Sequence, residues 1–134
     1  MKYYYHKLGT GNNLVEKHLV NDKKPIDKPE IAIFYGRLTK EEIVANKLDD
    51  YPARDQIVSF YKMSLAENRN DTTIILIYQG KIYFLKPIKE MYDRDLGPKE
   101  DIYKIVHVRI IKSINIADVP PILAGISSNR YLSS

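Results

Sequence analysis

The sequence predicts an α+β domain, in which short helices flank a curved sheet or small β-barrel. Its 134 residues suit one domain with a single core. Five segments have the apolar pattern of strands, and about four short segments have the pattern of helices. Because other elements separate most of these strands, their pairing must be largely non-local, which favours a bent sheet. We expect residues 1–134 to form one domain, the N-terminal fragment of a larger protein.

The first half of the chain mixes strands and helices. An aromatic strand is predicted over Lys2–Leu8, and apolar residues at helical spacing predict a short helix over Leu14–Val20. Residues 21–29 contain two prolines and three lysines, which predicts a surface loop. The apolar run Ile31–Tyr35 predicts a second strand, which should end at Gly36.

Two helices are predicted after this strand. Thr39 and Glu42 have the spacing of a capping box, so a helix should begin after Thr39. A longer helix should follow Pro52, because four apolar residues recur there on one stripe. They are Ile57, Phe60, Tyr61 and Leu65. We expect this stripe to pack on the sheet.

The clearest strand signal is a hairpin in the second half. Thr73–Tyr78 and Lys81–Leu85 are apolar runs of strand length. The intervening pair, Gln79 and Gly80, has the composition of a tight turn. These three segments predict two antiparallel neighbours in the sheet.

Weaker patterns complete the chain. The polar stretch Glu90–Asp101 contains a Gly-Pro pair and predicts a loop. Alternation over Tyr103–Lys112 predicts a strand with one core face and one partly solvated face. A short helix is predicted over Pro121–Ile126, and the lack of a closing strand after it is the reason to expect a fragment.

The composition argues against several classes of enzyme. The chain has no cysteine and only three scattered histidines, so neither disulfides nor a metal site are expected. It has no glycine-rich loop that ends in Lys-Ser or Lys-Thr, and Asp27 with Glu30 lacks the following lysine of a metal-dependent nuclease. We therefore expect a binding domain without catalytic residues, metal or cofactor.

Charge and hydropathy limit the kinds of partner. The 21 Lys and Arg residues outnumber the 17 Asp and Glu residues, and the net charge of +4 permits a polyanionic partner such as nucleic acid. No apolar run approaches the roughly 18 residues of a membrane span. The chain opens with a strand pattern and not with a signal peptide. We expect a cytoplasmic protein that does not bind membranes.

The end of the first strand has the residues best suited to ligand binding. The rings of Tyr3–Tyr5 are followed by Gly9-Thr10-Gly11-Asn12-Asn13. Aromatic rings stack on nucleobases, Asn side chains both donate to and accept from a base edge, and glycine permits close approach of the backbone. Stacking returns about 1–3 kcal/mol per base, so two rings and edge hydrogen bonds can offset the cost of unstacking one base. This segment predicts a pocket for a single base.

Each of these features also has a structural interpretation. The tyrosines Tyr3–Tyr5 are common strand residues, and Phe34 suits the core as well as a pocket. The glycines of Gly9–Gly11 can serve a simple turn, since the third glycine of a dinucleotide fingerprint is missing. Lys23, Lys24 and Lys28 suit a solvated loop as well as a phosphate contact.

Several stretches, taken together, are similar to one known family. In the first half they are Tyr5–Asn13 and Ile33–Gly36. In the second half they are Ile74–Phe84, Ile88–Met91, Val108–Lys112 and Asp118–Pro120. In order and pattern these stretches resemble the EVE and YTH branch of the PUA-like domains, and the resemblance covers most of the chain. It implies a PUA-like fold.

The resemblance also implies a site that holds one flipped-out, often methylated, base in an aromatic cage. It places the pocket on Leu8, Gly9, Thr10, Asn12, Asn13, Phe34, Tyr35, Gly36 and Tyr92, with Tyr103 as the next choice for the last ring. Cage rings in this branch are commonly tryptophan, and here Tyr and Phe would replace them. The basic residues expected to contact the flanking nucleic-acid backbone are Lys7, Arg37, Lys89, Arg94, Arg109 and Arg130.

Similar domains stand at the front of McrBC-type modification-dependent restriction motors. The resemblance therefore implies a specificity domain that targets DNA for a covalently attached C-terminal motor or effector domain. Two alternatives stay open. One is an RNA-binding PUA-like module, and the other is a non-catalytic protein-interaction domain that uses an exposed sheet edge or a tyrosine-rich face.

Overall fold

A six-stranded mixed sheet forms the frame of this computed structural model, which describes residues 2–7, 14–21 and 24–118. Its strands are β1 (Lys2–Tyr5), β4 (Glu30–Phe34), β5 (Thr72–Tyr78), β6 (Lys81–Pro87), β7 (Tyr92–Asp95) and β8 (Ile102–Asn115). The other elements are β2 (Val20–Asn21), β3 (Lys24–Pro25), α1 (Val15–His18), α2 (Lys40–Val44), α3 (Arg54–Met63), α4 (Ala66–Arg69) and the 3-10 turn η2 (Ile116–Asp118). The architecture is α+β, as predicted.

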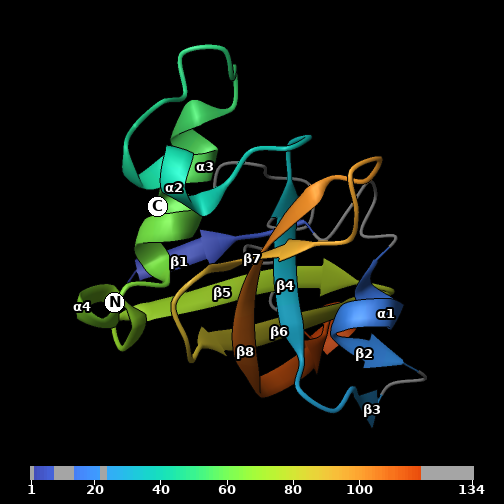
Figure 1. Cartoon of the computed structure of the whole chain (residues 1–134). Helices are drawn as coiled ribbons and strands as arrows, with labels where there is room; N and C mark the ends of the chain where they lie inside the picture. Colours follow the sequence, from blue (N-terminus) through green and yellow to red (C-terminus); the bar gives the residue numbers. More distant parts are fainter. Residues whose placement is uncertain (1, 8–13, 22–23, 119–134) are drawn as a thin grey trace.

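The long strand β8 gives the sheet its curvature. Its first part pairs with β4 on one edge and with β7 on the other, and its second part pairs with β6. Figure 1 shows β8 running alongside β4 and then curving beneath β6. A register shift at Phe84 and Leu85 of β6 marks an irregularity there, a feature that bends strands.

The sheet order is β1-β5-β6-β8-β4, and β1 and β5 form its parallel pair. Within the described part of the chain, no strand ladder joins β1 to β4, so the sheet is open. Of the two forms that the sequence allows, the structure has the curved sheet and not a closed barrel.

Helix α3 covers the sheet with the predicted apolar stripe. Ile57 and Phe60 are fully buried, and the Phe60 ring meets the Tyr4 ring of β1 edge-on at a centroid distance of 6.3 Å. Figure 1 shows α2 beside α3 and shows α1 at the other end of the sheet. The core therefore includes both the first strand and the longest helix.

Two local predictions are confirmed in detail. Thr39 caps α2, and Thr39 and Glu42 form both hydrogen bonds of the capping box. The β5–β6 hairpin turns at Gln79 and Gly80, whose φ values are +48° and +75°. Positive φ at both central residues is the requirement of a type I′ turn, which glycine meets without strain.

Other predictions were wrong in part. The expected loop over residues 90–101 contains β7, and the expected loop over residues 21–29 contains the short β2–β3 ladder. The first strand ends at Tyr5, and the short helix α4 was not predicted. Strand β7 has no apolar alternation because its polar side chains are paired on both faces, as described below. The predicted helix over residues 121–126 lies outside the described residues.

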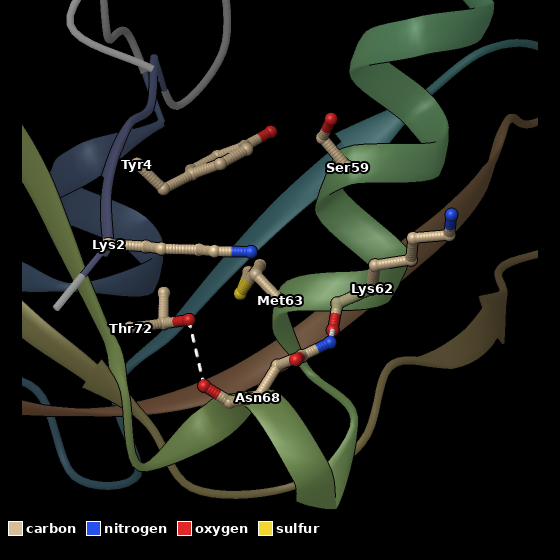
Figure 2. Close-up of a pocket in the computed structure, with 7 residues that line it drawn as sticks. All are labelled: Lys2, Tyr4, Ser59, Lys62, Met63, Asn68 and Thr72. Carbon is tan, nitrogen blue, oxygen red and sulfur yellow. Dashed lines mark hydrogen bonds between the residues drawn. The ribbon is translucent and has the colours of Figure 1, made fainter. Parts of the chain in front are cut away.

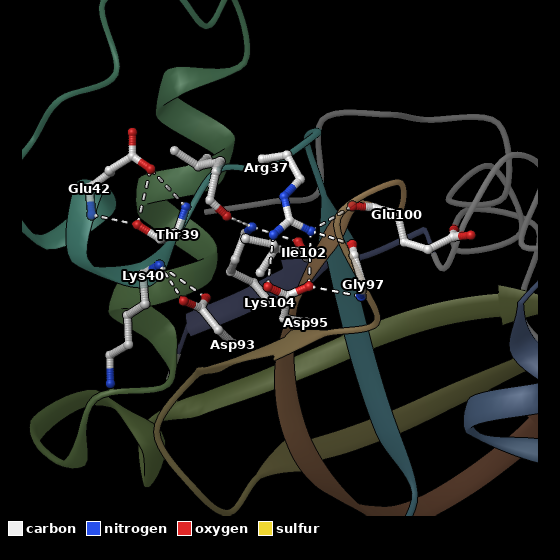
Figure 3. A network of polar contacts seen from close by, with 11 residues as sticks. Arg37, Thr39, Lys40, Glu42, Asp93, Asp95, Gly97, Glu100, Ile102 and Lys104 are labelled. Atoms are coloured by element: carbon white, nitrogen blue, oxygen red, sulfur yellow. Dashed lines mark hydrogen bonds and ion pairs between the residues drawn. The ribbon is translucent and has the colours of Figure 1, made fainter.

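Lys104 connects the turn after β4 to β8 from within the core. Its side chain is fully buried, and Nζ donates to the carbonyl oxygens of Leu38 and Ile102. Burial lowers the pKa of Lys104, because the charged form loses hydration. This buried contact helps to fix the turn that follows β4 (Figure 3).

Candidate functional site

Strands β4, β7 and β8 bring four rings to one face of the sheet. The register pairs Phe34 with Tyr103 across β4 and β8, and it pairs Tyr92 with Ile105 across β7 and β8. Because strand side chains alternate between faces, residues 103 and 107 of β8 lie on the same face. We call Phe34, Tyr92, Tyr103 and His107 the ring cluster.

The rings form two stacked pairs. Phe34 stacks on Tyr103 with centroids 5.0 Å apart and an interplanar angle of 20°. Tyr92 stacks on His107 with centroids 5.5 Å apart and the same angle. All four residues are half-buried, so none of the rings is sealed inside the core.

Glu30 lies at the centre of a polar network beside the rings. The Arg94 guanidinium reaches from β7 and donates to both Glu30 carboxylate oxygens, at 2.7 and 3.0 Å. His18 Nδ1 of α1 donates to the same carboxylate at 2.9 Å. Burial alone would raise the pKa of Glu30, but the hydrogen bonds and charges of Arg94 and His18 lower it below its ordinary value.

The network continues into the ring cluster. The Tyr92 hydroxyl lies 2.9 Å from His107 Nε2 and accepts a hydrogen bond from Arg94 at 2.9 Å. On the other side, His18 lies beside Tyr103, with ring centroids 6.2 Å apart. His18 Nε2 is buried and has no hydrogen-bond partner among the described residues, so one polar atom beside the rings stays unused.

Three cationic side chains lie near enough to His107 to affect its pKa. Burial lowers the pKa of His107, and the nearby charges of Lys89, Arg94 and Lys28 lower it further against the opposing effect of Glu30. Arg109 is exposed two residues farther along β8. We call Lys28, Lys89, Arg94 and Arg109 the basic rim. Together the rim and the rings form a surface suited to a flat anionic ligand.

A second network, the arginine clamp, lies at the other end of β4. Arg37 donates to both carboxylate oxygens of Asp95, at 2.9 and 2.8 Å, and to the carbonyl oxygens of Gly97 and Glu100 (Figure 3). The ion pair with Asp95 raises the pKa of Arg37 and lowers the pKa of Asp95. Arg37, a predicted backbone contact, thus has its donors engaged by the turn after β7.

The structure brings together only some of the predicted pocket residues. Phe34 and Tyr92 share the face of the ring cluster, and Tyr92, like Tyr35, also packs against the core. Tyr35 lies near enough to Tyr4 to raise the pKa of Tyr4. Gly36 is exposed with a φ of +59°, and its carbonyl oxygen accepts a hydrogen bond from Ile102.

The predicted residues of the first turn, 8–13, lie outside the described part of the chain, and so does Arg130. The described segments on either side of this turn both contact β4. His6 Nε2 donates to the Ala32 carbonyl oxygen at 3.2 Å, and His18 binds Glu30. Lys7, Lys89 and Arg109 are exposed, as a contact with nucleic acid requires.

Sequence reasoning missed three members of the site. Glu30, His18 and His107 are polar residues within apolar patterns, and such a mismatch is the one signal that could have identified them. Tyr103 was only the second choice for a ring. The register of β8 against both neighbours, which no local pattern encodes, decides the positions of Tyr103 and His107.

The described residues offer neither a metal site nor a membrane-spanning helix. No three His, Asp or Glu side chains gather there in a way that could hold a metal ion. No helix in the same residues is long and apolar enough to cross a bilayer. Comparisons of the chain with protein-family models, curated proteins and solved structures found no match.

Proposed function

We propose that this chain is a nucleic-acid-binding specificity domain, which recognises a single flipped-out base at the ring cluster. The observation that carries the proposal is the presence of two half-buried ring stacks on one sheet face, bordered by Lys28, Lys89 and Arg109 and by Arg94, which is already paired with Glu30. Bases stack on aromatic rings, and lysine and arginine neutralise phosphates.

The polar network supplies the groups that could distinguish one base from another. Glu30 accepts hydrogen bonds from His18 and Arg94. His18 Nε2 has no hydrogen-bond partner among the described residues. The amino groups and ring nitrogens of base edges form hydrogen bonds with such side chains. A base stacked on Tyr103 would lie beside His18, which is 6.2 Å from that ring.

DNA is the favoured ligand, with RNA as the alternative, and the proposal extends to methylated bases. By the resemblance noted above, the domain would target DNA for a McrBC-type restriction complex in the cytoplasm. In such an arrangement the motor or effector would be a further domain attached after this one. The ring cluster and the basic rim require no cofactor for binding.

Fluorescence anisotropy tests the proposal. Labelled methylated duplex DNA, unmethylated duplex DNA and single-stranded RNA are titrated with the protein at several salt concentrations. At least one ligand should bind, and the logarithm of its affinity should fall as the logarithm of the salt concentration rises. If none binds at low salt, the protein-interaction alternative is favoured instead.

A pair of matched variants then locates the binding surface. Phe34→Leu removes a ring of the cluster but keeps an apolar side chain, and it should weaken binding by about 1–3 kcal/mol through lost stacking. Tyr61→Leu is the control, because Tyr61 is also half-buried but belongs to α3. Equal losses in the two variants would contradict the assignment of the base to the ring cluster.

The basic rim has a separate test. Lys89→Gln should weaken binding to all sequences alike and reduce the slope of the salt dependence by about 1. Lys47→Gln removes the same charge from an exposed position outside the rim. An unchanged slope in Lys89→Gln would remove Lys89 from the phosphate contacts.

A further inference from the structure

A small cavity lies between β1, α3 and α4, separate from the ring cluster. Its volume is about 140 Å³, and its lining residues are Lys2, Tyr4, Ser59, Lys62, Met63, Asn68 and Thr72. Ligand pockets for whole organic molecules usually measure about 300–1,000 Å³, and a water molecule occupies about 30 Å³ of liquid. The cavity therefore suits a group of a few heavy atoms and not an entire nucleotide.

The Lys2 amine and the Tyr4 and Ser59 hydroxyls can each donate a hydrogen bond within the cavity. Figure 2 shows the Lys2 amine extending between Tyr4 and Met63, and it shows the Ser59 hydroxyl facing the Tyr4 hydroxyl. Within the part of the chain that the structure describes, these three groups have no hydrogen-bond or ion-pair partner. Their donors remain available to a ligand.

The rest of the wall is held in place by its own hydrogen bonds. Asn68 Nδ2 donates to the Lys62 carbonyl oxygen at 2.8 Å, and Thr72 Oγ1 donates to the Asn68 carbonyl oxygen at 2.9 Å. These contacts join α3, α4 and β5 around the cavity, as Figure 2 shows for the second of them. The wall is thus built before any ligand binds, which lowers the entropic cost of binding.

Charge and protonation both favour an anion. The described lining includes no carboxylate, and the Lys2 amine is directed into the cavity, whereas the Lys62 amine points away from it (Figure 2). Tyr4 is 8% exposed, and burial, with a smaller effect of Tyr35, raises its pKa far above neutrality. The Tyr4 hydroxyl therefore keeps its proton and can donate to an anionic oxygen.

We propose that this cavity binds a phosphate-sized oxyanion, with Lys2 as the counter-charge and the Tyr4 and Ser59 hydroxyls as donors. The anion is either free inorganic phosphate or the terminal phosphate of a nucleic acid, since both present the same oxygens. The site goes beyond base recognition, because none of its residues belongs to the ring cluster or the basic rim.

The test is a titration of the full 15N-labelled chain with inorganic phosphate, followed by NMR at constant ionic strength. The amide signals of Lys2, Tyr4 and Ser59 should shift and saturate with phosphate but not with chloride. Lys2→Gln should weaken phosphate binding about tenfold or more, because a charged hydrogen-bond donor is lost. Lys47→Gln, the matched control at an exposed position, should leave it unchanged.

Two further variants make the outcome decisive. Tyr4→Phe and Ser59→Ala each remove one hydroxyl and keep the shape of the wall, and each should weaken phosphate binding severalfold. The proposal is overturned if wild-type signals do not saturate, if chloride shifts them equally, or if Lys2→Gln and Lys47→Gln behave alike.

The source of the phosphate and the independence of the site are tested separately. An oligonucleotide with a 5′-phosphate should bind more tightly than its unphosphorylated form if the anion is a nucleic-acid end, and Lys2→Gln should abolish the difference. Equal binding of the two forms assigns the site to free phosphate. Phe34→Leu should not affect phosphate binding, so failure of base recognition and failure of this site give different results.

Discussion

The two ends of β4 are held by opposite kinds of interaction. Near its start, Glu30 is buried and contacts His18 and Arg94, and the Ala32 carbonyl accepts from the buried His6. After its end, Arg37 binds Asp95 with both side chains about half exposed. One end therefore depends on buried groups whose protonation matters, and the other on an ion pair in contact with solvent.

Strand β7 takes part at both ends because its side chains alternate. Tyr92 and Arg94 join the Glu30 network, while Asp93 and Asp95 point the other way, to the amide of Lys40 and to Arg37. The buried network positions the ring cluster, and the clamp positions a turn. Buried polar contacts contribute more to stability than exposed ones, so the two ends should respond differently to mutation.

The largest change in stability should come from protonation of His6 at acid pH. Burial lowers the pKa of His6 from 6.5 to about 4, against a weaker opposing effect of its hydrogen bond to Ala32. Between those pH values the unfolded chain binds a proton that the folded chain does not, so stability falls as pH falls. The loss should approach about 3 kcal/mol at pH 4, at 1.36 kcal/mol per pH unit.

Urea unfolding at a series of pH values measures this fall. The His6→Phe variant keeps an aromatic ring next to Phe60 and removes the titrating group, so its stability should vary much less over the same range. The pKa of His107 is also lowered, so the stability of the variant should still fall to a smaller extent as the pH falls. A wild-type profile that is flat from pH 6.5 to 4 would contradict the assignment to His6.

The next largest effect should follow from Glu30→Gln. This change removes the negative charge that Arg94 and His18 face, and it should lower the free energy of unfolding by about 2 kcal/mol at neutral pH. The loss is smaller than for a fully buried pair because the Arg94 side chain is 34% exposed. Asp95→Asn, the same change in the clamp, should cost clearly less, and equal losses would remove the contrast between the two ends.

Local patterns in the sequence predicted the parts of the fold that local interactions determine. The capping box at Thr39 and the turn at Gln79 and Gly80 each depend on residues within four positions of one another, and both are confirmed. The apolar stripe of α3 was correct for Ile57 and Phe60, whose burial follows from helical spacing, whereas Leu65 lies beyond the end of the helix.

The parts that the sequence did not predict depend on distant partners. Arg94 and Glu30 are 64 positions apart, and neither residue signals the other locally. Strand β7 has the sequence Tyr-Asp-Arg-Asp, a polar pattern that by itself indicates a loop. Only its pairing with β8 and the partners of its side chains show that it is a strand. Phe34 and Tyr92 were predicted for the site through the family resemblance. Glu30, His18 and His107 were not predicted, because their roles depend on partners that are distant in the sequence.

A smaller effect is expected from Tyr92→Phe. The variant keeps the ring that stacks on His107 but removes the hydroxyl that contacts His107 and Arg94. Thermal or urea unfolding should show a loss of about 1 kcal/mol, the usual net contribution of a buried hydrogen bond. Affinity for the best nucleic-acid ligand should change little, because stacking is retained. A large loss of affinity with little loss of stability would instead indicate that the hydroxyl contacts the base.

The smallest effect on stability should come from Arg37→Gln in the clamp. Exposed ion pairs are screened by solvent and salt, so the urea midpoint should move less than in Tyr92→Phe. The local effect should be larger, because Arg37 also holds the carbonyl oxygens of Gly97 and Glu100. Hydrogen exchange should therefore become faster at Gly97, whose amide donates to Asp95, while amides of β8 that pair with β4 stay protected. Faster exchange throughout β4 and β8 would show that the clamp supports the whole sheet edge, and the two ends of β4 would then be coupled and not independent.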